Sequence, residues 1–280
     1  MKILLDNGIF SHAEFMRPDV QERRISWGDV VTVLPVHGFR RKEPHNDPEY
    51  QRQIDALFTV GRLIREDRIE AYNYDEIAVE GYRGAAKFPA CNALRACKVH
   101  HCPPPLTRSK FRSTTNLMES FSKGGYKDRK AGAYSEYSQI SFFQFLQALQ
   151  SPHVNLLIQS AGKIGLTGFE IESLQTLEWF QLMCNRFGGK PPDLSPENFP
   201  DVFHLGTAER NGLDGVLTLE RKLPAVVEQV RKEKIKKIEI RSLALRPLDL
   251  LRVLGIDDPD PIPVEPDRFY HQHELPSPVA

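Results

Sequence analysis

The order of strand-like and helix-like segments is the feature that most limits how this chain can fold. Short apolar runs typical of strands occur at residues 2–5, 69–74, 153–160, 214–220 and 237–243. Helical periodicity fills the intervals, at residues 47–67, 139–150, 168–189, 195–212, 223–235 and 246–256. Strands that alternate with helices predict an α/β protein with three layers, in which helices cover both faces of a central, mostly parallel sheet.

Two regions depart from this alternation. Residues 83–135 are rich in Gly, Ser, Lys and Arg and contain three consecutive prolines, and we interpret them as a segment inserted into the domain. Residues 257–280 are rich in Pro and Asp and are expected to form a poorly ordered tail. The prediction is one domain at residues 1–256, with the inserted segment at about 83–135, followed by the tail.

The charge balance excludes a global electrostatic attraction to nucleic acid or to an anionic membrane. Lys plus Arg and Asp plus Glu both total 37, which gives a formal net charge of zero. The N-terminus lacks the basic and apolar regions of a signal peptide, and no run of about 18 apolar residues could span a bilayer. We therefore expect a cytoplasmic protein that does not bind membranes, with any polyanion bound by a local patch.

Carboxylates follow several of the predicted strands. Asp6 ends the first strand, Glu80 lies in the helix after the strand at 69–74, Asp201 starts a helix, and Glu220 ends the strand at 214–220. In parallel α/β folds the carboxyl ends of the strands form the ligand-binding edge of the sheet. Four acids gathered there would repel one another unless cations neutralised them, and Mg²⁺ or Mn²⁺ suits oxygen ligands best. Such ions can activate water against a phosphodiester.

The same stretches resemble a known family. "FPDVFHLGTAERNGLDGVLTLERKL", followed by "LRPLDLLRVLGI", is similar to the carboxy-terminal half of PIN-like domains, in which an Asp opens a helix and an L-T-x-acid motif follows. "ILLDNGIFS" resembles the first strand of that family, and "YNYDEIAVE" the segment that carries its second acid. The resemblance implies a metal-dependent ribonuclease that leaves 3′-hydroxyl and 5′-phosphate ends, with Asp6, Glu80, Asp201 and Glu220 as its catalytic, metal-binding acids.

Other interpretations of these acids stay open. Glu76 shares a helical face with Glu80 and is the second choice for that position, and Asp214 is a second choice although it fits a turn. Asp201 could be a helix cap, and Glu220 could form a surface ion pair with its basic neighbours. A haloacid-dehalogenase-like phosphatase ranks lower, because that chemistry needs an Asp at the position of Gly8.

Basic and aromatic residues alternate within the inserted segment. This mixture suits a single-stranded nucleic acid, because cations pair with phosphates while bases stack on the rings. A solvated loop is the alternative. RNA is the predicted substrate, and relatives suggest an antitoxin-like protein partner and a homodimer. The candidate substrate-binding residues are Arg108, Lys110, Arg112, Lys127 and Arg129.

Three of the four cysteines cluster with histidines in "CNALRACKVHHC". Thiolates and imidazoles suit zinc, but the spacing does not match a C-x2-C knuckle. Buried, reduced thiols are the preferred interpretation, and a zinc site is the alternative. Its ligands would be Cys91, Cys97, His101 and Cys102.

The sequence thus favours a Mg²⁺- or Mn²⁺-dependent ribonuclease of PIN-like fold. The alternative is a PIN-like module that has lost catalysis and binds RNA or another protein.

Overall fold

The structure, a computed structural model, describes residues 1–77, 91–105, 156, 159–168, 199–233 and 239–275. Its central sheet has five strands in the order β5-β4-β1-β6-β7, and every pair is parallel. β1 is central. The strand bounds are β1 Lys2–Leu5, β4 Glu70–Asn73, β5 Val99–His101, β6 Gly215–Leu217 and β7 Leu243–Leu245.

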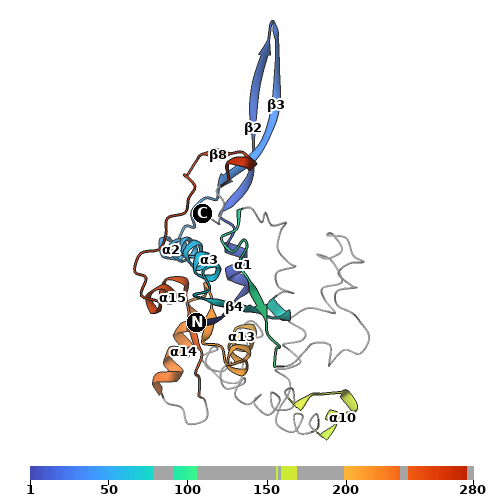
Figure 1. Cartoon of the computed structure of the whole chain (residues 1–280), viewed down its shortest axis with the longest axis vertical. Helices are drawn as coiled ribbons and strands as arrows, with labels where there is room; N and C mark the ends of the chain where they lie inside the picture. The colour runs from blue at the N-terminus through green and yellow to red at the C-terminus, as the bar shows by residue number, and fades with distance from the viewer. Residues whose placement is uncertain (78–90, 106–155, 157–158, 169–198, 234–238, 276–280) are drawn as a thin grey trace.

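Helices flank this sheet, which confirms the predicted three-layer α/β/α arrangement. α2, α3 and α15 lie together on one face, whereas α13 packs against β1 and β6 and α14 packs against β7 (Figure 1). The α-helix bounds are α1 Asn7–His12, α2 Pro48–Asp55, α3 Leu57–Arg65, α10 Ala161–Ile164, α13 Phe199–Arg210, α14 Lys222–Glu233 and α15 Pro247–Val253.

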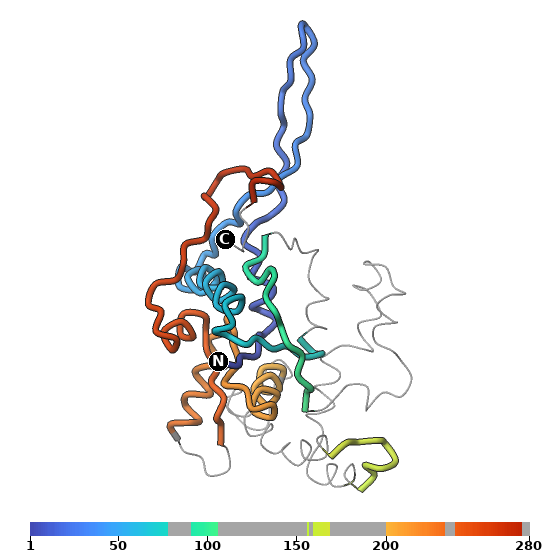
Figure 2. Tube along the Cα trace, viewed as in Figure 1, coloured from blue at the N-terminus to red at the C-terminus, as the bar shows by residue number. Residues whose placement is uncertain are grey.

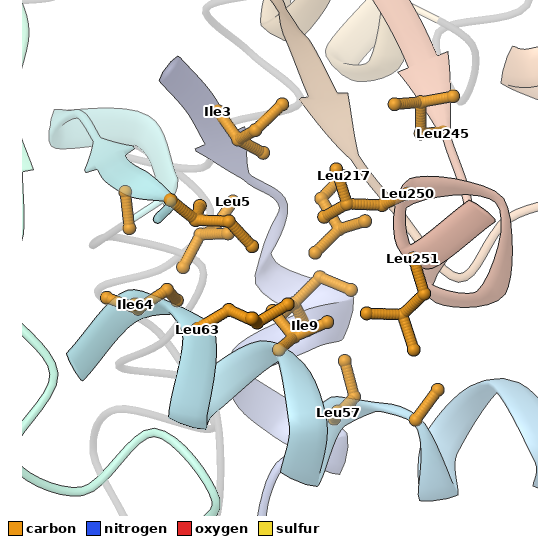
Figure 3. Close-up of a cluster of buried hydrophobic side chains, with 14 of the residues drawn as sticks. Ile3, Leu5, Ile9, Leu57, Leu63, Ile64, Leu217, Leu245, Leu250 and Leu251 are labelled. Atoms are coloured by element: carbon orange, nitrogen blue, oxygen red, sulfur yellow. The ribbon is translucent and has the colours of Figure 1, made fainter. Parts of the chain in front are cut away.

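The largest described core cluster fills the space between the sheet and the first helical layer (Figure 3). Side chains alternate across a strand, so Ile3 and Leu5 of β1 point to this layer together with Leu217 of β6. They meet Leu63 of α3 and Leu251 of α15. Complete burial of an aliphatic side chain contributes about 1.5–3 kcal/mol, so this cluster holds the central strands to the helices.

The helix predicted at residues 47–67 begins where its sequence indicates. The Asp47 carboxylate accepts hydrogen bonds from the backbone N–H groups of Glu49 and Tyr50, and Pro48 occupies the first helical position. The helical stretch divides at Ala56 into α2 and α3. The apolar face of α3, including Leu63 and the neighbouring Ile64, is buried as the periodicity predicts.

Several strand predictions need correction. The sequence predicts a strand at residues 237–243, but strand β7 is Leu243–Leu245. It begins at the last residue of the predicted stretch. The stretch 153–160 was predicted as a strand, but Leu156 and Gln159 are helical. Val99–His101, which falls within the segment interpreted as inserted, forms the edge strand β5 and pairs with β4. This part of the segment therefore belongs to the central sheet.

A long antiparallel hairpin projects from the body. Its strands are β2 Met16–Trp27 and β3 Val30–Arg41, and they pair along their whole length. We call this hairpin the ribbon; Figure 2 shows it extending far beyond the helices. Gly28 and Asp29 form the two-residue turn, and Gly28 has φ +61°, as expected at the first central position of a type II′ turn.

The prediction of a poorly ordered tail is wrong for residues 257–275. The Asp260 carboxylate accepts a hydrogen bond of 2.7 Å from Nε of Arg62, and Val264 and Tyr270 are buried. Strand β8, Phe269–Tyr270, pairs with the base of β3 in a second sheet of order β2-β3-β8, and a short 3-10 helix, Gln272–Glu274, follows. Apolar residues spaced among the prolines anchor this segment.

None of the helices among the residues described is long and apolar enough to cross a bilayer.

Candidate functional site

The strands of the central sheet bring several polar side chains to one edge, which we call the carboxyl edge. Because β1, β4, β6 and β7 run parallel, their carboxyl ends meet there. Asp6 follows β1, Tyr74 follows β4, Thr218 follows β6 and Arg246 follows β7. The predicted position of Asp6 at this edge is therefore confirmed.

Asp6 is held by the neighbouring strand rather than by its own helix. It occupies the N-cap position of α1, yet its carboxylate forms no cap hydrogen bond. Instead Oδ2 accepts a hydrogen bond of 2.9 Å from Oγ1 of Thr218, which is itself buried. The same hydroxyl oxygen accepts from the backbone N–H of Glu220 at 3.1 Å. Thr218 thus fixes Asp6 and also the turn that leads to Glu220.

A buried histidine lies on the other side of Asp6. His204 of α13 has its Nε2 3.7 Å from Oδ1 of Asp6, and its Nδ1 is 2.6 Å from the hydroxyl of Tyr74. Both the imidazole and the phenol are buried. When the Tyr74 hydroxyl donates to Nδ1, the neutral imidazole carries its hydrogen on Nε2, which faces Asp6. Only 13% of the Asp6 side chain is exposed, so the carboxylate has little freedom to turn.

The charges of Asp6 and Glu220 both act on the phenol of Tyr50 in α2. Burial raises the pKa of the Tyr50 phenol above its ordinary value, and the negative charges of Glu220 and Asp6 raise it further. The phenol is therefore protonated at neutral pH. The positive charge of Arg246 acts in the opposite direction and lowers the pKa of Tyr50, so this cation also acts on the phenol.

An ion network lies beside these acids. Glu49 of α2 accepts a hydrogen bond of 2.7 Å from Arg246 and one of 3.1 Å from Arg221, which also bonds Asp47 at 2.6 Å. The bond from Arg246, then that from Gln53, lowers the pKa of Glu49 to about 2. Nε and Nη2 of Arg246 are buried and form no hydrogen bond. The carboxyl edge therefore holds a buried cation that is paired with Glu49.

A cavity of about 260 Å³ lies beside His12 and His45. The rings of His12 and His45 pack against the Tyr50 ring, with centroids 5.7 Å and 4.6 Å away, and both line the cavity. Its walls are mixed in character, and Phe15 and Ile54 are apolar members of the lining. Most of the other lining residues are polar or charged.

The other predicted acids lie in different settings. Asp201 is in the first turn of α13, one turn before His204, so the segment carrying it starts at the carboxyl edge. Glu76, the second choice, is buried in the segment after β4. Glu80 lies outside the described residues. Asp214 lies at the opposite edge, where its Oδ2 accepts from the backbone N–H of Lys2 at 2.7 Å, and it therefore cannot join Asp6.

The donor chemistry at the carboxyl edge suits a hard cation. Carboxylate and amide oxygens are the ligands that Mg²⁺ and Mn²⁺ prefer. Next to Asp6, Oδ1 of Asn7 is buried and accepts no hydrogen bond. Within the described part of the chain, however, no three His, Cys, Asp or Glu side chains are grouped so that they could hold a metal ion. A complete site would need a further ligand, and Glu80 has the position in sequence to supply one.

The structure separates the proposed zinc ligands. Cys91 packs in a cluster with Met16 and Tyr270, Cys97 donates to the backbone O of Gly61 at 3.2 Å, and Cys102 lies against the O of Asn73. The fourth candidate, His101, has its Nε2 3.0 Å from the carboxylate of Asp75.

The chemistry of these thiols agrees with that separation. Burial raises the pKa of Cys91 and of Cys102 to about 11, and it also raises that of Cys97. These are the properties of buried, reduced thiols.

The predicted substrate-binding residues Arg108, Lys110, Arg112, Lys127 and Arg129 lie outside the described residues. Tyr50, Tyr74, His204 and Arg246 were not predicted to belong to the site. His204 follows Asp201 by three residues, on the same helical face, and Arg246 directly follows β7. These spacings were the available signals. The position of Tyr50 relative to the strand ends depends on tertiary packing alone.

Comparisons with models of known protein families, with curated proteins and with solved structures found no match.

Proposed function

We propose that this chain is a divalent-metal-dependent nuclease of PIN-like fold that hydrolyses phosphodiester bonds in RNA. The observation that carries the proposal is the position of Asp6, at the carboxyl end of the central strand and bonded to Thr218 of the neighbouring strand. Thr218 and Glu220 are the residues of the L-T-x-acid motif, so two motifs separated by more than 200 residues in sequence meet at a single hydrogen bond.

The topology supports the remaining acids. β4 ends at the same edge as β1, so the segment after β4 begins there. Because α13 precedes β6, the helix starts at the carboxyl edge and runs toward the edge where β6 begins, so its first turn lies at the carboxyl edge. Asp6, Glu80, Asp201 and Glu220 are thus the residues we assign to hold the cation. A cation bound there would lower the pKa of a water molecule and stabilise negative charge on the phosphodiester.

The surrounding residues have separate tasks in this proposal. Thr218 and His204 restrain the two oxygens of Asp6, so that its carboxylate keeps one orientation. Tyr50 is a neutral phenol within the electrostatic field of Asp6 and Glu220, and it can donate a hydrogen bond to a substrate oxygen.

Cleavage of a labelled single-stranded RNA tests the proposal. The wild-type protein should cut it with Mn²⁺ and stop when a chelator is added. Asp6→Asn and Asp201→Asn should abolish cleavage and leave the circular dichroism spectrum unchanged. Asp258→Asn makes the same chemical change at an exposed residue of the segment after α15, and it should retain full activity. Equal cleavage by the two site variants and the control would contradict the assignment.

A second candidate is a PIN-like module without catalysis that binds RNA or another protein. It is favoured by the lack of a three-residue metal-binding group within the described ranges. This module would bind RNA without cutting it and would not need Asp6 for binding. RNA retained on a filter by both the wild type and Asp6→Asn, with no cleavage by either, would support this candidate.

A further inference from the structure

The ribbon exposes an unusual amount of apolar surface. Seven of the nine large hydrophobic side chains that are exposed among the described residues belong to it. Trp27 at the tip is 89% exposed, and every residue from 20 to 35 is exposed although both strands are fully paired. The seven side chains are Val20, Ile25, Trp27, Val30, Val31, Val33 and Leu34.

These side chains divide between the two faces of the ribbon. Residues directly opposite each other in an antiparallel pair share a face, and the face alternates along each strand. Trp27 pairs with Val30, Ile25 with Thr32 and Arg23 with Leu34, which together form what we call the Trp face. The opposite face carries Val20, Val31 and Val33.

The body of the protein supports only the base of the ribbon. The third strand of this sheet, β8, pairs with Phe39 and Arg40, and the paired residues nearer the tip have no third strand among the described residues. A two-stranded hairpin alone is marginally stable in water, and a large exposed apolar patch marks an interaction surface. Something with an apolar surface of its own is expected to cover it.

We propose that the Trp face is a homodimer interface, covered by the Trp face of a second copy of this chain. The charges agree with self-association: the exposed part of the ribbon carries Glu22 and Asp29 against Arg23 and Arg24, so two ribbons do not repel each other through net charge. A strongly basic or acidic ribbon would have pointed to a partner of the opposite charge.

The order of residues on the Trp face is self-complementary. Along β2, Arg23, Ile25 and Trp27 occupy successive positions on this face. A twofold axis at Ile25 places Trp27 of one copy over Arg23 and Leu34 of its partner, and the reverse contact forms by symmetry. Each Trp27 then gains an apolar contact with Leu34 and a cation–π contact with Arg23.

The area is sufficient for a specific but modest interface. From typical areas of buried side chains, Trp27, Val30, Ile25 and Leu34 offer on the order of 500 Å² per copy. Two copies would bury about 1,000 Å², near the lower limit for a specific protein contact. We therefore expect a reversible dimer whose population depends on concentration, not an obligate one.

Analytical ultracentrifugation of the full chain tests the proposal. At about 100 μM the wild type should sediment as a dimer, with twice the monomer mass of 32.0 kDa, and it should dissociate on dilution. Trp27→Ser combined with Leu34→Ser should be monomeric at the same concentration. Val31→Ser combined with Val33→Ser makes a matched change on the opposite face and should dimerise like the wild type. Circular dichroism and thermal melting should show that both variants remain folded.

Three results would overturn the proposal. The first is a wild type that is monomeric throughout this range. The second is a dimer that survives the Trp-face variant, or is lost only in the opposite-face variant. The third is a monomer whose ribbon binds vesicles of phosphatidylcholine and phosphatidylglycerol, since that would assign the apolar surface to lipid. None of these results bears on cleavage, because the ribbon variants leave the carboxyl edge intact.

Discussion

In β1 the apolar side chains Ile3, Leu4 and Leu5 are fully buried, whereas in the ribbon strand β3 the side chains of Val30, Val31 and Val33 are exposed. Both segments have the composition of a strand, and both are fully paired. The difference is the number of layers: helices cover β1 on both faces, and the ribbon has no layer among the described residues. Backbone pairing therefore does not decide which strands belong to the core.

Truncating one leucine in each region should give the largest contrast. Leu5→Ala removes a fully buried side chain between the sheet and the helices and should lower the free energy of unfolding by about 2–5 kcal/mol. Leu34→Ala, in the ribbon, should change it by less than about 0.5 kcal/mol. Urea unfolding of both variants measures this difference. Equal losses would show that the ribbon is part of the cooperative core.

Glycine-to-alanine changes in the two regions should destabilise different parts of the molecule. A Cβ at Gly61 of α3 would overlap the backbone O of Ala93, so Gly61→Ala should destabilise the body by about 1–3 kcal/mol. Gly28→Ala meets no atom and is strained only through its positive φ. Its cost of about 1–2 kcal/mol should open the tip of the ribbon locally. Hydrogen exchange should therefore rise at the tip in Gly28→Ala and across the sheet in Gly61→Ala.

Much of the body could be predicted from its sequence. Short apolar runs and helical periodicity predicted the positions of β1, α3 and α15. Such elements are buried at least in part, and the spacing of their apolar residues indicates which side chains face the core. Asp6 could be placed at the carboxyl edge because a parallel sheet has one such edge. The L-T-x-acid motif gave Glu220 and, through it, the position of Thr218.

The ribbon and part of the site could not be predicted in this way. The ribbon has apolar residues on both faces, so no alternation marked its strands; the two-residue Gly28–Asp29 turn was the local signal that was missed. The segment after Asp257 was misread because its prolines suggested disorder, whereas Val264 and Tyr270 anchor it. The contact of His204 with Tyr74 joins residues 130 apart in sequence and depends on how α13 packs.

Thr218 should link the stability of the carboxyl edge to its chemistry. Thr218→Val keeps the shape but removes the hydrogen bonds to Asp6 and from Glu220, and it should cost about 1–2 kcal/mol of stability. Cleavage should fall on the order of tenfold, because Asp6 loses its orientation. Thr218→Ser restores the hydroxyl and should recover most of the activity. If Thr218 acted through packing alone, the order would be reversed, and Thr218→Val would keep more cleavage activity than Thr218→Ser.

Glu49 should give the smallest effect, and a pH-dependent one. Its pKa is about 2 in the folded protein, below the ordinary value of 4.5, so its contribution to stability is present above about pH 4.5 and is lost as the pH falls toward 2. Because 45% of the side chain is exposed, this contribution should stay below about 1 kcal/mol. In urea unfolding, Glu49→Gln should have a lower free energy of unfolding than the wild type at about pH 7. The difference between the two proteins should be smaller at about pH 3. If the difference in free energy of unfolding does not change with pH, the ion pair with Arg246 is not its cause.

We propose that the carboxyl edge, not the ribbon, binds the cation and carries the chemistry. Titration of Mn²⁺, followed by the electron paramagnetic resonance signal of the free ion, tests it most directly. We predict that Asp6→Asn weakens Mn²⁺ binding by more than about tenfold, while the Trp27→Ser, Leu34→Ser variant of the ribbon binds like the wild type. Equal Mn²⁺ affinity in the wild type and in Asp6→Asn would contradict the account.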